Sequence, residues 1–322
     1  MRGVGAVHRV LVPVGAPVGA AAVELVRTAA RVRSEPGDRD RPRVVGRRCG
    51  DRATCPIQPN DVIGVIGGSG FYEFLAAAEP VDVTTPFGSP AAPVTVGLLD
   101  DQQIAFLPRH GRDHEFVAHR VPYRANIWAM NSLGVRSLIA PCSVGSLQPD
   151  IHPEQLVIVD QLIDRTHGRS DTFHDVGGPT DEPGSRPPVH HQTFADPYDP
   201  DLRATLVATA RRTGIDVVDG GTMVVINGPR FSTRAESRWF RQMGWQVINM
   251  TGYPEAVLAA EMGIRYATVG LVTDYDAGID GAQPVTMDEV FAVMRSNVAR
   301  VRELITATVA DLGDLAERSP DP

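Results

Sequence analysis

The feature that most constrains this chain is a series of short apolar runs, each ending at glycine, proline or a polar residue. Two examples are VIGVIGG at residues 62–68 and YATVGLVTD at residues 266–274. Their apolar residues are continuous and rich in valine and isoleucine, which is typical of strands buried on both faces of a sheet. The other runs of this kind are residues 93–99, 103–108, 137–144, 155–164, 220–227 and 246–250.

Segments with helical periodicity lie between these runs. They are residues 123–133, 201–214, 234–244, 254–263 and 286–312, with Asp201 as a candidate N-cap for the second. Alternating strands and helices predict a single α/β domain over residues 61–312, with a central mixed, mainly parallel β-sheet flanked by helices. Residues 313–322 are expected to form a flexible C-terminal tail.

The first sixty residues have a different composition from the rest. They hold eleven arginines against five acidic residues, whereas the whole chain has a net charge of −8. This Pro/Gly/Arg-rich stretch has little apolar periodicity, so we expect a disordered or artefactual N-terminal extension at residues 1–60. A transit peptide or a basic docking tail is the alternative.

Composition excludes several classes of protein. All 31 basic residues are arginine, so no P-loop lysine or Schiff-base lysine is present. The negative net charge argues against a nucleic-acid binder, and the absence of a long apolar segment or signal peptide predicts a cytoplasmic protein away from the membrane. Three scattered cysteines, Cys49, Cys55 and Cys142, predict reduced thiols and no metal site.

Candidate anion-binding groups follow two of the predicted strands. Ser69 stands in the glycine-rich turn after the first strand, where free backbone N–H groups can approach an anion, although a plain turn explains it equally well. The stretch PRHGRDH at residues 108–114 offers Arg109, His110, Arg112 and His114. Arginine matches an oxyanion by its fork and histidine can donate to the same anion, whereas a metal site on His110 and His114 lacks supporting ligands.

Other predicted strand ends carry further candidates. Cys142 is either a nucleophile or, as is usual for a buried cysteine, a small hydrophobe. Phe231 suits stacking on a planar ring, and core packing is the alternative for Phe231 and Met250. The run VGLVTDYDAG ends in two carboxylates, Asp274 and Asp276. Because ligands of α/β sheets gather at the carboxyl ends of strands, these ends are expected to share one site.

Five stretches in this order, GVIGGSG, PRHG, SVGSL, GPRFSTRAE with NMTGYPE, and TDYDAG, closely resemble the purine nucleoside phosphorylase and methylthioadenosine phosphorylase family. The similarity spans about residues 61–312 and is strongest to the methylthioadenosine branch. The resemblance implies a homotrimeric pentosyltransferase that cleaves a purine nucleoside with inorganic phosphate as co-substrate and without cofactor or metal. It further implies a role in purine and methionine salvage.

The resemblance also implies roles for particular residues. The phosphate site comprises Ser69, Arg109, His110, Cys142, Ser143 and Thr251; the family often has Thr or Ser where Cys142 stands. The substrate site comprises Met250 against the ribose, Phe231 near the base, His191 across the trimer interface, and Asp274, Tyr275 and Asp276 at the purine. His110, Asp274 and Asp276 are expected to be catalytic. Ser232 and Met287 are expected to determine specificity, Met287 beside the 5′ group of the ribose.

The implied reaction explains why this buried strand ends in two acidic residues. Phosphorolysis of an N-ribosidic bond leaves negative charge on the departing purine, and a carboxyl group with a raised pKa at Asp274 can protonate N7. An ionised Asp276 accepts from a 6-amino group and repels O6, which favours adenine. An apolar thioether at Met287 suits a 5′-methylthio group better than a hydroxyl. The expected reaction is therefore phosphorolysis of S-methyl-5′-thioadenosine.

Four other functions are alternatives to this reaction. The nearest is a phosphorylase of the same fold that acts on inosine, guanosine or methylthioinosine, because a protonated Asp276 tolerates O6. A catalytically silent nucleoside-binding protein would have lost Arg109, His110 or Asp274, and all three are present. A nucleoside hydrolase would need no anion cluster. A dinucleotide-dependent dehydrogenase lacks support because no GxGxxG motif opens a helix.

Overall fold

The computed structural model describes residues 8–10, 61–68, 79–99, 102–175, 190–277 and 285–318, with side chains described for all of these except 8–10 and 313–318. Within the predicted N-terminal extension it therefore describes only the short strand β1 (His8–Val10), which pairs in parallel with β3 (Glu79–Val83). The disordered or artefactual character of residues 1–60 stays a prediction.

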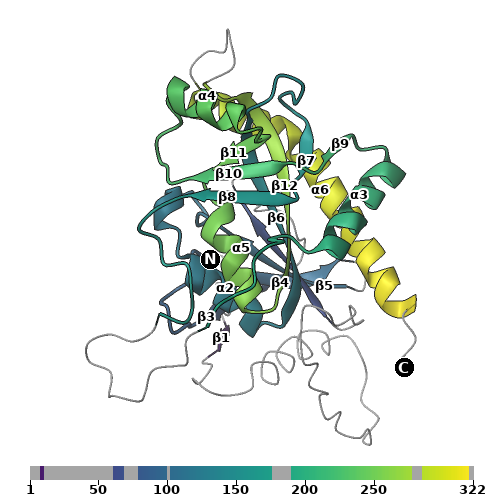
Figure 1. Ribbon diagram of the computed structural model, residues 1–322. Coiled ribbons are helices and arrows are strands. Elements are labelled where there is room, and N and C mark those ends of the chain that lie inside the picture. The colour runs from purple at the N-terminus through teal and green to yellow at the C-terminus, as the bar shows by residue number, and fades with distance from the viewer. Residues whose placement is uncertain are drawn as a thin grey trace, which may run out of the picture.

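A mixed sheet forms the centre of the molecule (Figure 1). Its order is β1-β3-β4-β5-β2-β6-β11-β10-β8, with β12 paired to β6 and β7, and β7 paired to β9. Seven of the eleven strand pairs between described residues are parallel, which confirms the predicted fold class. The remaining strands are β2 (Val62–Gly67), β4 (Val94–Leu99), β5 (Gln102–Pro108), β6 (Val135–Ser146), β7 (Leu156–Ile158), β8 (Gln161–Arg165), β9 (Val217–Asp219), β10 (Thr222–Ile226), β11 (Val247–Asn249) and β12 (Arg265–Tyr275).

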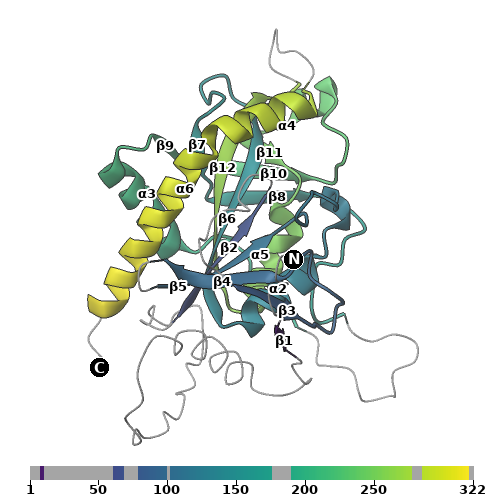
Figure 2. The same cartoon turned by 180° about the vertical axis from the view of Figure 1, so that it is seen from behind.

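Helices cover both faces of this sheet. One apolar core joins β2 and β6 to α2 and α5, and a second joins β2 and β12 to α3 and α6. Figure 2 shows the long α6, in yellow, running across the molecule with α3 beside it. On β2, Ile66 lies in the first core and Ile63 in the second, so both faces are buried. This explains why the apolar runs are continuous. The helices are α2 (Tyr123–Ser132), α3 (Pro200–Thr213), α4 (Arg234–Gln242), α5 (Gly252–Glu261) and α6 (Met287–Arg318), with a 3₁₀ turn, η2 (Ala118–Arg120).

One predicted strand is divided in the structure, and another is shortened. The run 155–164 forms β7 and β8, which have different partners, and the run 220–227 contributes only β10. The division occurs where Asp160 Oδ1 accepts a hydrogen bond of 3.0 Å from the Gly221 N–H. Gly220 and Gly221 both have positive φ, at 95° and 127°, which takes them out of a regular strand.

Several boundaries also differ from the predicted ones. Helix α3 begins at Pro200, and its N-cap is Asp199, whose side chain accepts from the Leu202 N–H, rather than Asp201. Strand β3 was not predicted, because its sequence EPVDV holds a proline and two acids. Helix α6 continues past residue 312 to Arg318. None of the described helices is both long and apolar enough to cross a membrane.

The strand ends converge from two directions. Strands β2, β5, β6 and β12 run parallel to one another, so the residues after β2, β5 and β12 lie at one edge. Strand β11 runs antiparallel to β6, with Ile248 opposite Gly145. The residues that follow β11 therefore meet β6 within the strand, near Cys142 and Ser143, rather than at its end.

Candidate active site

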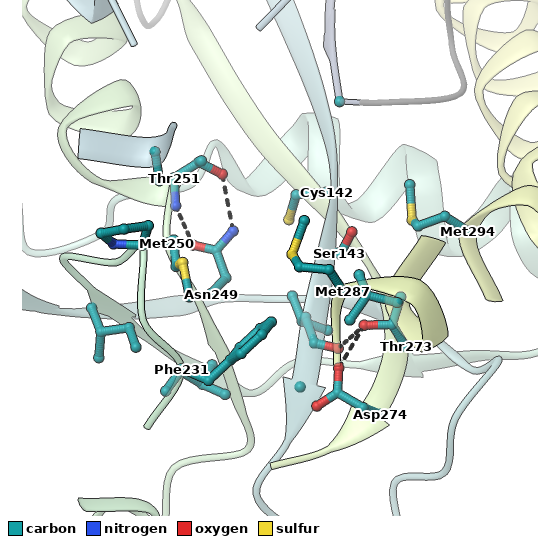
Figure 3. A pocket seen from close by; sticks show the side chains of 18 of the residues that line it. Cys142, Ser143, Phe231, Asn249, Met250, Thr251, Thr273, Asp274, Met287 and Met294 are labelled. Carbon is teal, nitrogen blue, oxygen red and sulfur yellow. Dashed lines mark hydrogen bonds between the residues drawn. The ribbon is translucent and has the colours of Figure 1, made fainter. Parts of the chain in front are cut away.

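A cavity of about 200 Å³ lies where these strand ends and the first turns of α6 meet (Figure 3). Gly68 and Arg109 lie at its walls after β2 and β5, and Asp274 and Asp276 lie at the end of β12. The predicted site residues that line it are Arg109, His110, Cys142, Ser143, Phe231, Ser232, Met250, Thr251, Asp274, Asp276 and Met287. Residues far apart in the sequence thus share one cavity.

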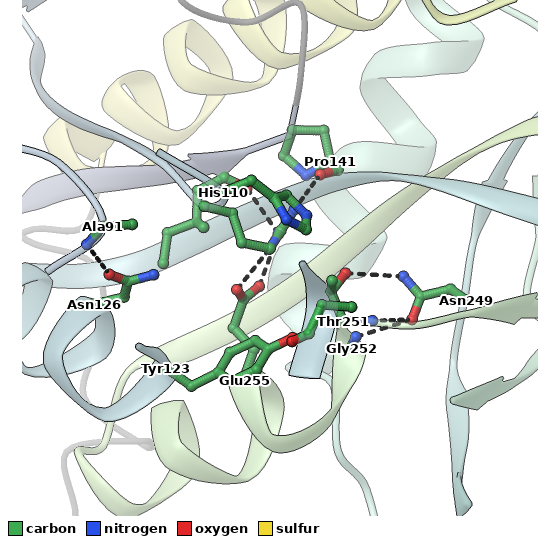
Figure 4. Close-up of polar contacts among 12 residues, drawn as sticks. Ala91, His110, Tyr123, Asn126, Pro141, Asn249, Thr251, Gly252 and Glu255 are labelled. Atoms are coloured by element: carbon green, nitrogen blue, oxygen red, sulfur yellow. Dashed lines mark hydrogen bonds and ion pairs between the residues drawn. The ribbon is translucent and has the colours of Figure 1, made fainter. Parts of the chain in front are cut away.

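Arg109 is held at the cavity wall by a buried carboxylate of α5, that of Glu255, which is labelled in Figure 4. The two side chains are 2% and 1% exposed, and the guanidinium binds the carboxylate through Nε at 2.7 Å and Nη2 at 2.8 Å. Nη2 also donates to Ile66 O at 2.9 Å, and Nη1 to Pro141 O at 3.1 Å. Burial lowers the pKa of Arg109, but the ion pair with Glu255 raises it further, so the net shift is upward and the guanidinium stays charged.

One donor of Arg109 has no partner among the described residues and can serve a ligand. A guanidinium has five N–H groups, and the four hydrogen bonds above leave one on Nη1. Nη1 lies 4.0 Å from the position that a Cβ on Gly68 would take. The free donor is therefore beside the turn that follows β2, on the cavity side.

His110 is fixed by its own loop. Its Nδ1 lies 2.7 Å from Phe116 O, and its ring stacks on His114 with centroids 4.4 Å apart. Since a carbonyl oxygen only accepts, Nδ1 carries the proton. Burial, with the neighbouring Arg109 and His114 charges, lowers the pKa of His110 to about 4. The ring is neutral near pH 7, and Nε2 then presents a lone pair rather than the donor expected from the sequence.

The residues after β11 form a tight polar turn (Figures 3 and 4). Asn249 Oδ1 accepts from the N–H groups of Thr251 and Gly252, each at 2.9 Å, and Asn249 Nδ2 donates to Thr251 Oγ1 at 3.1 Å. Because the Thr251 hydroxyl already accepts this bond, its own proton is available for a ligand in the cavity. Thr251 is thereby oriented as a donor.

Cys142 lies on β6 beside this turn and is buried. Burial raises the pKa of the thiol to about 12, although Arg109 opposes the rise. Reactive cysteines have a lowered pKa and partial exposure. The structure therefore favours a small packing residue over a nucleophile at position 142.

Asp274 is aimed into the cavity by an irregularity in the sheet. The register of β12 against β6 shifts between Val272 and Asp274, so Thr273 is an extra residue, as in a β-bulge. Its hydroxyl donates to Asp274 Oδ2 at 2.7 Å. A Cβ on Gly145 would lie 2.9 Å from Asp274 Oδ1, so glycine makes room for this carboxylate. Burial, together with Asp276 and Glu289, raises the pKa of Asp274 to about 6.

Asp276 presents an unpaired oxygen. The residue is 3% exposed, and its Oδ2 has no hydrogen-bond partner among the described residues. The buried Ser232 Oγ has none within the same part of the chain. Burial raises the pKa of Asp276, and the nearby hydroxyl groups of Ser237 and Ser232 oppose the rise. A buried acceptor without a donor is costly unless a ligand supplies one.

Apolar side chains line the rest of the cavity. Met287, Val290, Phe291 and Met294 come from the start of α6 and recur at helical spacing. Phe231 and Met250 lie opposite them after β10 and β11 (Figure 3). Such a wall suits an aromatic ring and an apolar substituent.

Arg169 supports this wall from behind. Its guanidinium donates to the carbonyl oxygens of Asn227 at 2.8 Å and Met250 at 2.9 Å, and also to that of Tyr253. The side chain thus ties the ends of β10 and β11 together. Neither Arg169 nor Glu255 received a role from the sequence, because only the folded chain brings them to their partners.

Of the predicted site residues, Tyr275 and His191 do not line the cavity. Ser69 lies outside the described residues. Tyr275 is the last residue of β12 and stands between Asp274 and Asp276, but its hydroxyl contacts His152 Nδ1 at 2.5 Å. His191 and Arg112 are exposed and are not among the residues that line this cavity. The predicted roles of Ser69, Tyr275 and His191 stay predictions.

Glu255, Phe291 and Met294 received no predicted role, although the sequence holds a signal for each. Glu255 is an acid in the otherwise apolar stretch PEAVLAA, and a lone charge on a buried helix face needs a partner. The spacing of Met287, Phe291 and Met294 also predicts one apolar stripe on α6. Among the described residues, no three His, Cys, Asp or Glu side chains gather in a way that could hold a metal ion.

The cavity at the edge of this α/β sheet has an arginine at one end and two buried carboxyl groups at the other. Such a site suits an enzyme that binds a small molecule with an anionic group at one end and hydrogen-bond donors at the other. The model of the phosphorylase superfamily matches residues 62–310, and the chain belongs to this family.

Named relatives are similar over most of the chain. An S-methyl-5′-thioadenosine phosphorylase of Mycolicibacterium smegmatis is 55% identical over 76% of this chain and 88% of its own length. A purine nucleoside phosphorylase of Streptomyces coelicolor is 47% identical over 80% and 91%. The structure of methylthioadenosine phosphorylase from Schistosoma mansoni in complex with adenine superposes with a TM-score of 0.74, at 36% identity, covering 79% of this chain and 92% of that one.

Proposed function

We propose that the protein catalyses phosphorolysis of S-methyl-5′-thioadenosine, giving adenine and 5-methylthioribose 1-phosphate. The observation that carries the proposal is that Arg109 and the pair Asp274 and Asp276 line the same cavity. Relatives named for this activity and an adenine complex of a similar structure support it. In the cell, such a reaction would serve purine and methionine salvage.

Phosphate is proposed to bind at the Arg109 end of the cavity. Within the described part of the chain, Arg109 Nη1 and the Thr251 hydroxyl each keep a proton for an oxyanion. Ser143, with the backbone near Cys142, borders the same space. Ser69 is proposed to add a hydroxyl from the turn after β2. A phosphate oxygen held here attacks the anomeric carbon and offsets the positive charge that develops on the ribose.

The base is proposed to bind between Phe231 and the two aspartates. Asp274, with its pKa raised to about 6, retains part of its proton near neutral pH and gives it to N7 as the bond to the ribose breaks. Asp276 Oδ2, which has no partner among the described residues, accepts from the 6-amino group. Ser232 Oγ, equally without a partner there, faces the same end of the purine.

The ribose is proposed to lie on Met250, with its 5′ group toward Met287. Both thioethers line the cavity, and the neighbouring Phe291 and Met294 are apolar. A methylthio group buries apolar surface here, whereas these four side chains offer a 5′-hydroxyl no strong hydrogen-bond partner. This wall favours the methylthio nucleoside.

We further propose a homotrimer in which a neighbouring subunit completes the site. Val117 and Met287 line the cavity, yet they are 42% and 47% exposed, so apolar surface at its rim is uncovered in a single chain. His191 and Tyr275, which do not line this cavity, are candidates for contacts across the subunit border. The cytoplasmic location stays a prediction.

A second candidate function is phosphorolysis of a 6-oxopurine nucleoside such as inosine, guanosine or methylthioinosine. The 47% identical relative named as a purine nucleoside phosphorylase favours it, and the raised pKa of Asp276 would let a protonated carboxyl group meet O6. Initial rates with methylthioadenosine and inosine, each at saturating phosphate, separate the two functions. We expect methylthioadenosine to be preferred by at least about 100-fold in kcat/KM; a preference for inosine would overturn the substrate assignment.

A further inference from the structure

We propose that His110 accepts, through Nε2, a hydrogen bond from a proton carried by the bound anion, so that the site selects hydrogen phosphate over dianions without a proton. The inference rests on the proposed function, which brings phosphate to the Arg109 end of the cavity. It adds a reason why the site takes phosphate rather than another tetrahedral oxyanion.

The geometry of the loop after β5 fixes the donor and acceptor nitrogens. His110 Nδ1 lies 2.7 Å from Phe116 O, and the Phe116 N–H returns to His110 O at 3.1 Å. The ring also stacks on His114, which in turn meets the ring of Phe291 of α6 edge-on at 5.7 Å. Because Nδ1 is committed to a carbonyl, Nε2 is the only ring nitrogen left for a ligand in the cavity.

The charges around His110 keep Nε2 unprotonated. The groups that face it are Arg109 on its own loop, which is paired with Glu255 of α5, and His114 stacked on its ring. A second positive charge beside Arg109 is unfavourable, and burial adds to this effect, so the pKa of His110 is lowered to about 4. Nε2 therefore carries a lone pair at neutral pH, and His110 lines the same cavity as Arg109 and Thr251.

A hydrogen-bond acceptor in an anion site favours anions that carry a proton over anions that carry none. Between about pH 5 and 9, phosphate carries one or two protons and can donate to Nε2, whereas sulfate carries none and would place an oxygen lone pair against it. An unsatisfied buried contact of this kind weakens binding by roughly 10- to 100-fold. Arg109 Nη1 and the Thr251 hydroxyl donate to either anion, so they do not discriminate.

Direct binding of anions tests the inference. The dissociation constants of phosphate, arsenate, sulfate and monofluorophosphate are measured by calorimetry at pH 7.5 on the full-length protein. Arsenate carries a proton as phosphate does, while sulfate and monofluorophosphate are dianions without one. We expect phosphate and arsenate to bind within about threefold of each other and the other two at least roughly tenfold more weakly. Equal binding of sulfate and phosphate would overturn the inference.

A pair of variants locates the selectivity. In His110→Gln the side-chain amide can turn its NH₂ group toward the anion, so the ratio of sulfate to phosphate dissociation constants is expected to fall to within about threefold of one. Arg112→Gln removes a positive charge from an exposed position of the same loop, and should leave the ratio unchanged. An unchanged ratio in His110→Gln would contradict the role of Nε2; if that variant does not fold, the wild-type ratios decide.

Failure of this inference and failure of the proposed function give different experimental results. Selective binding of phosphate without phosphate-dependent cleavage of any purine nucleoside would leave the inference standing and refute the reaction. If cleavage needs phosphate, and sulfate competes for the site with an affinity equal to that of phosphate, the inference is refuted and the reaction still stands. Failure of phosphate to bind would overturn both.

Discussion

The ion pair between Arg109 and Glu255 gives the sharpest test of how this site is held together. Glu255→Gln keeps the volume of the side chain and removes its charge, leaving the Arg109 guanidinium buried with a neutral partner. Removing one member of a buried pair costs about 3–5 kcal/mol. Glutamine can still accept one of the two hydrogen bonds, which measure 2.7 and 2.8 Å in the native pair. We therefore expect a loss near the lower end, about 3 kcal/mol.

Urea denaturation followed by tryptophan fluorescence measures this loss in the free energy of unfolding. A matched control is Arg230→Gln, because Arg230 and Glu236 form the same two-bond contact, with both distances at 2.7 Å, on an exposed surface. Exposed pairs contribute less than about 1 kcal/mol. A loss in Glu255→Gln no larger than in Arg230→Gln would refute the reasoning that burial makes the Arg109 pair essential.

Three further predictions concern the carboxylates and the wall of the cavity. The pKa of Asp274 is raised from 3.8 to about 6 in the folded chain, so ionisation of Asp274 lowers the stability of the fold by about 3 kcal/mol above pH 6 and has no effect below pH 4. In urea titrations, Asp274→Asn should therefore be about that much more stable than the wild type at pH 8, and the difference should shrink toward zero at pH 4. A gain in stability that does not change with pH would contradict this prediction. Asp276→Asn should lower kcat/KM for methylthioadenosine at least tenfold more than for inosine, and equal losses would show that this carboxylate does not contact the 6-position. Arg169→Gln frees carbonyl oxygens at the ends of β10 and β11; we expect about 2 kcal/mol less stability and a higher KM for the nucleoside with a smaller change in kcat, whereas an unchanged KM would remove Arg169 from the support of the site.

The sequence predicted the sheet well because its signal is local. A strand buried on both faces, such as β2 with Ile63 in one core and Ile66 in the other, must be apolar at every position. The predictions failed where a tertiary contact decides. The break between β7 and β8 depends on Asp160 meeting Gly221, more than fifty residues away in the chain.

The site was predicted to a similar extent and for the same reason. Residues at or just beyond the end of a strand, such as Arg109, Thr251 and Asp274, stand beside a recognisable apolar run. Glu255 and Arg169 act on partners distant in sequence, and nothing local shows which carbonyl or guanidinium they meet. The bulge at Thr273, which turns Asp274 toward the cavity, likewise depends on the pairing of β12 with β6.

The central claim is that one cavity holds phosphate and a purine nucleoside so that the phosphate attacks the ribose. Incubation with methylthioadenosine and phosphate labelled with oxygen-18, followed by mass spectrometry, tests it most directly. The account predicts adenine and an equal amount of a methylthioribose phosphate that keeps every labelled oxygen, with neither product formed when phosphate is omitted. Free methylthioribose released in the absence of phosphate would contradict it.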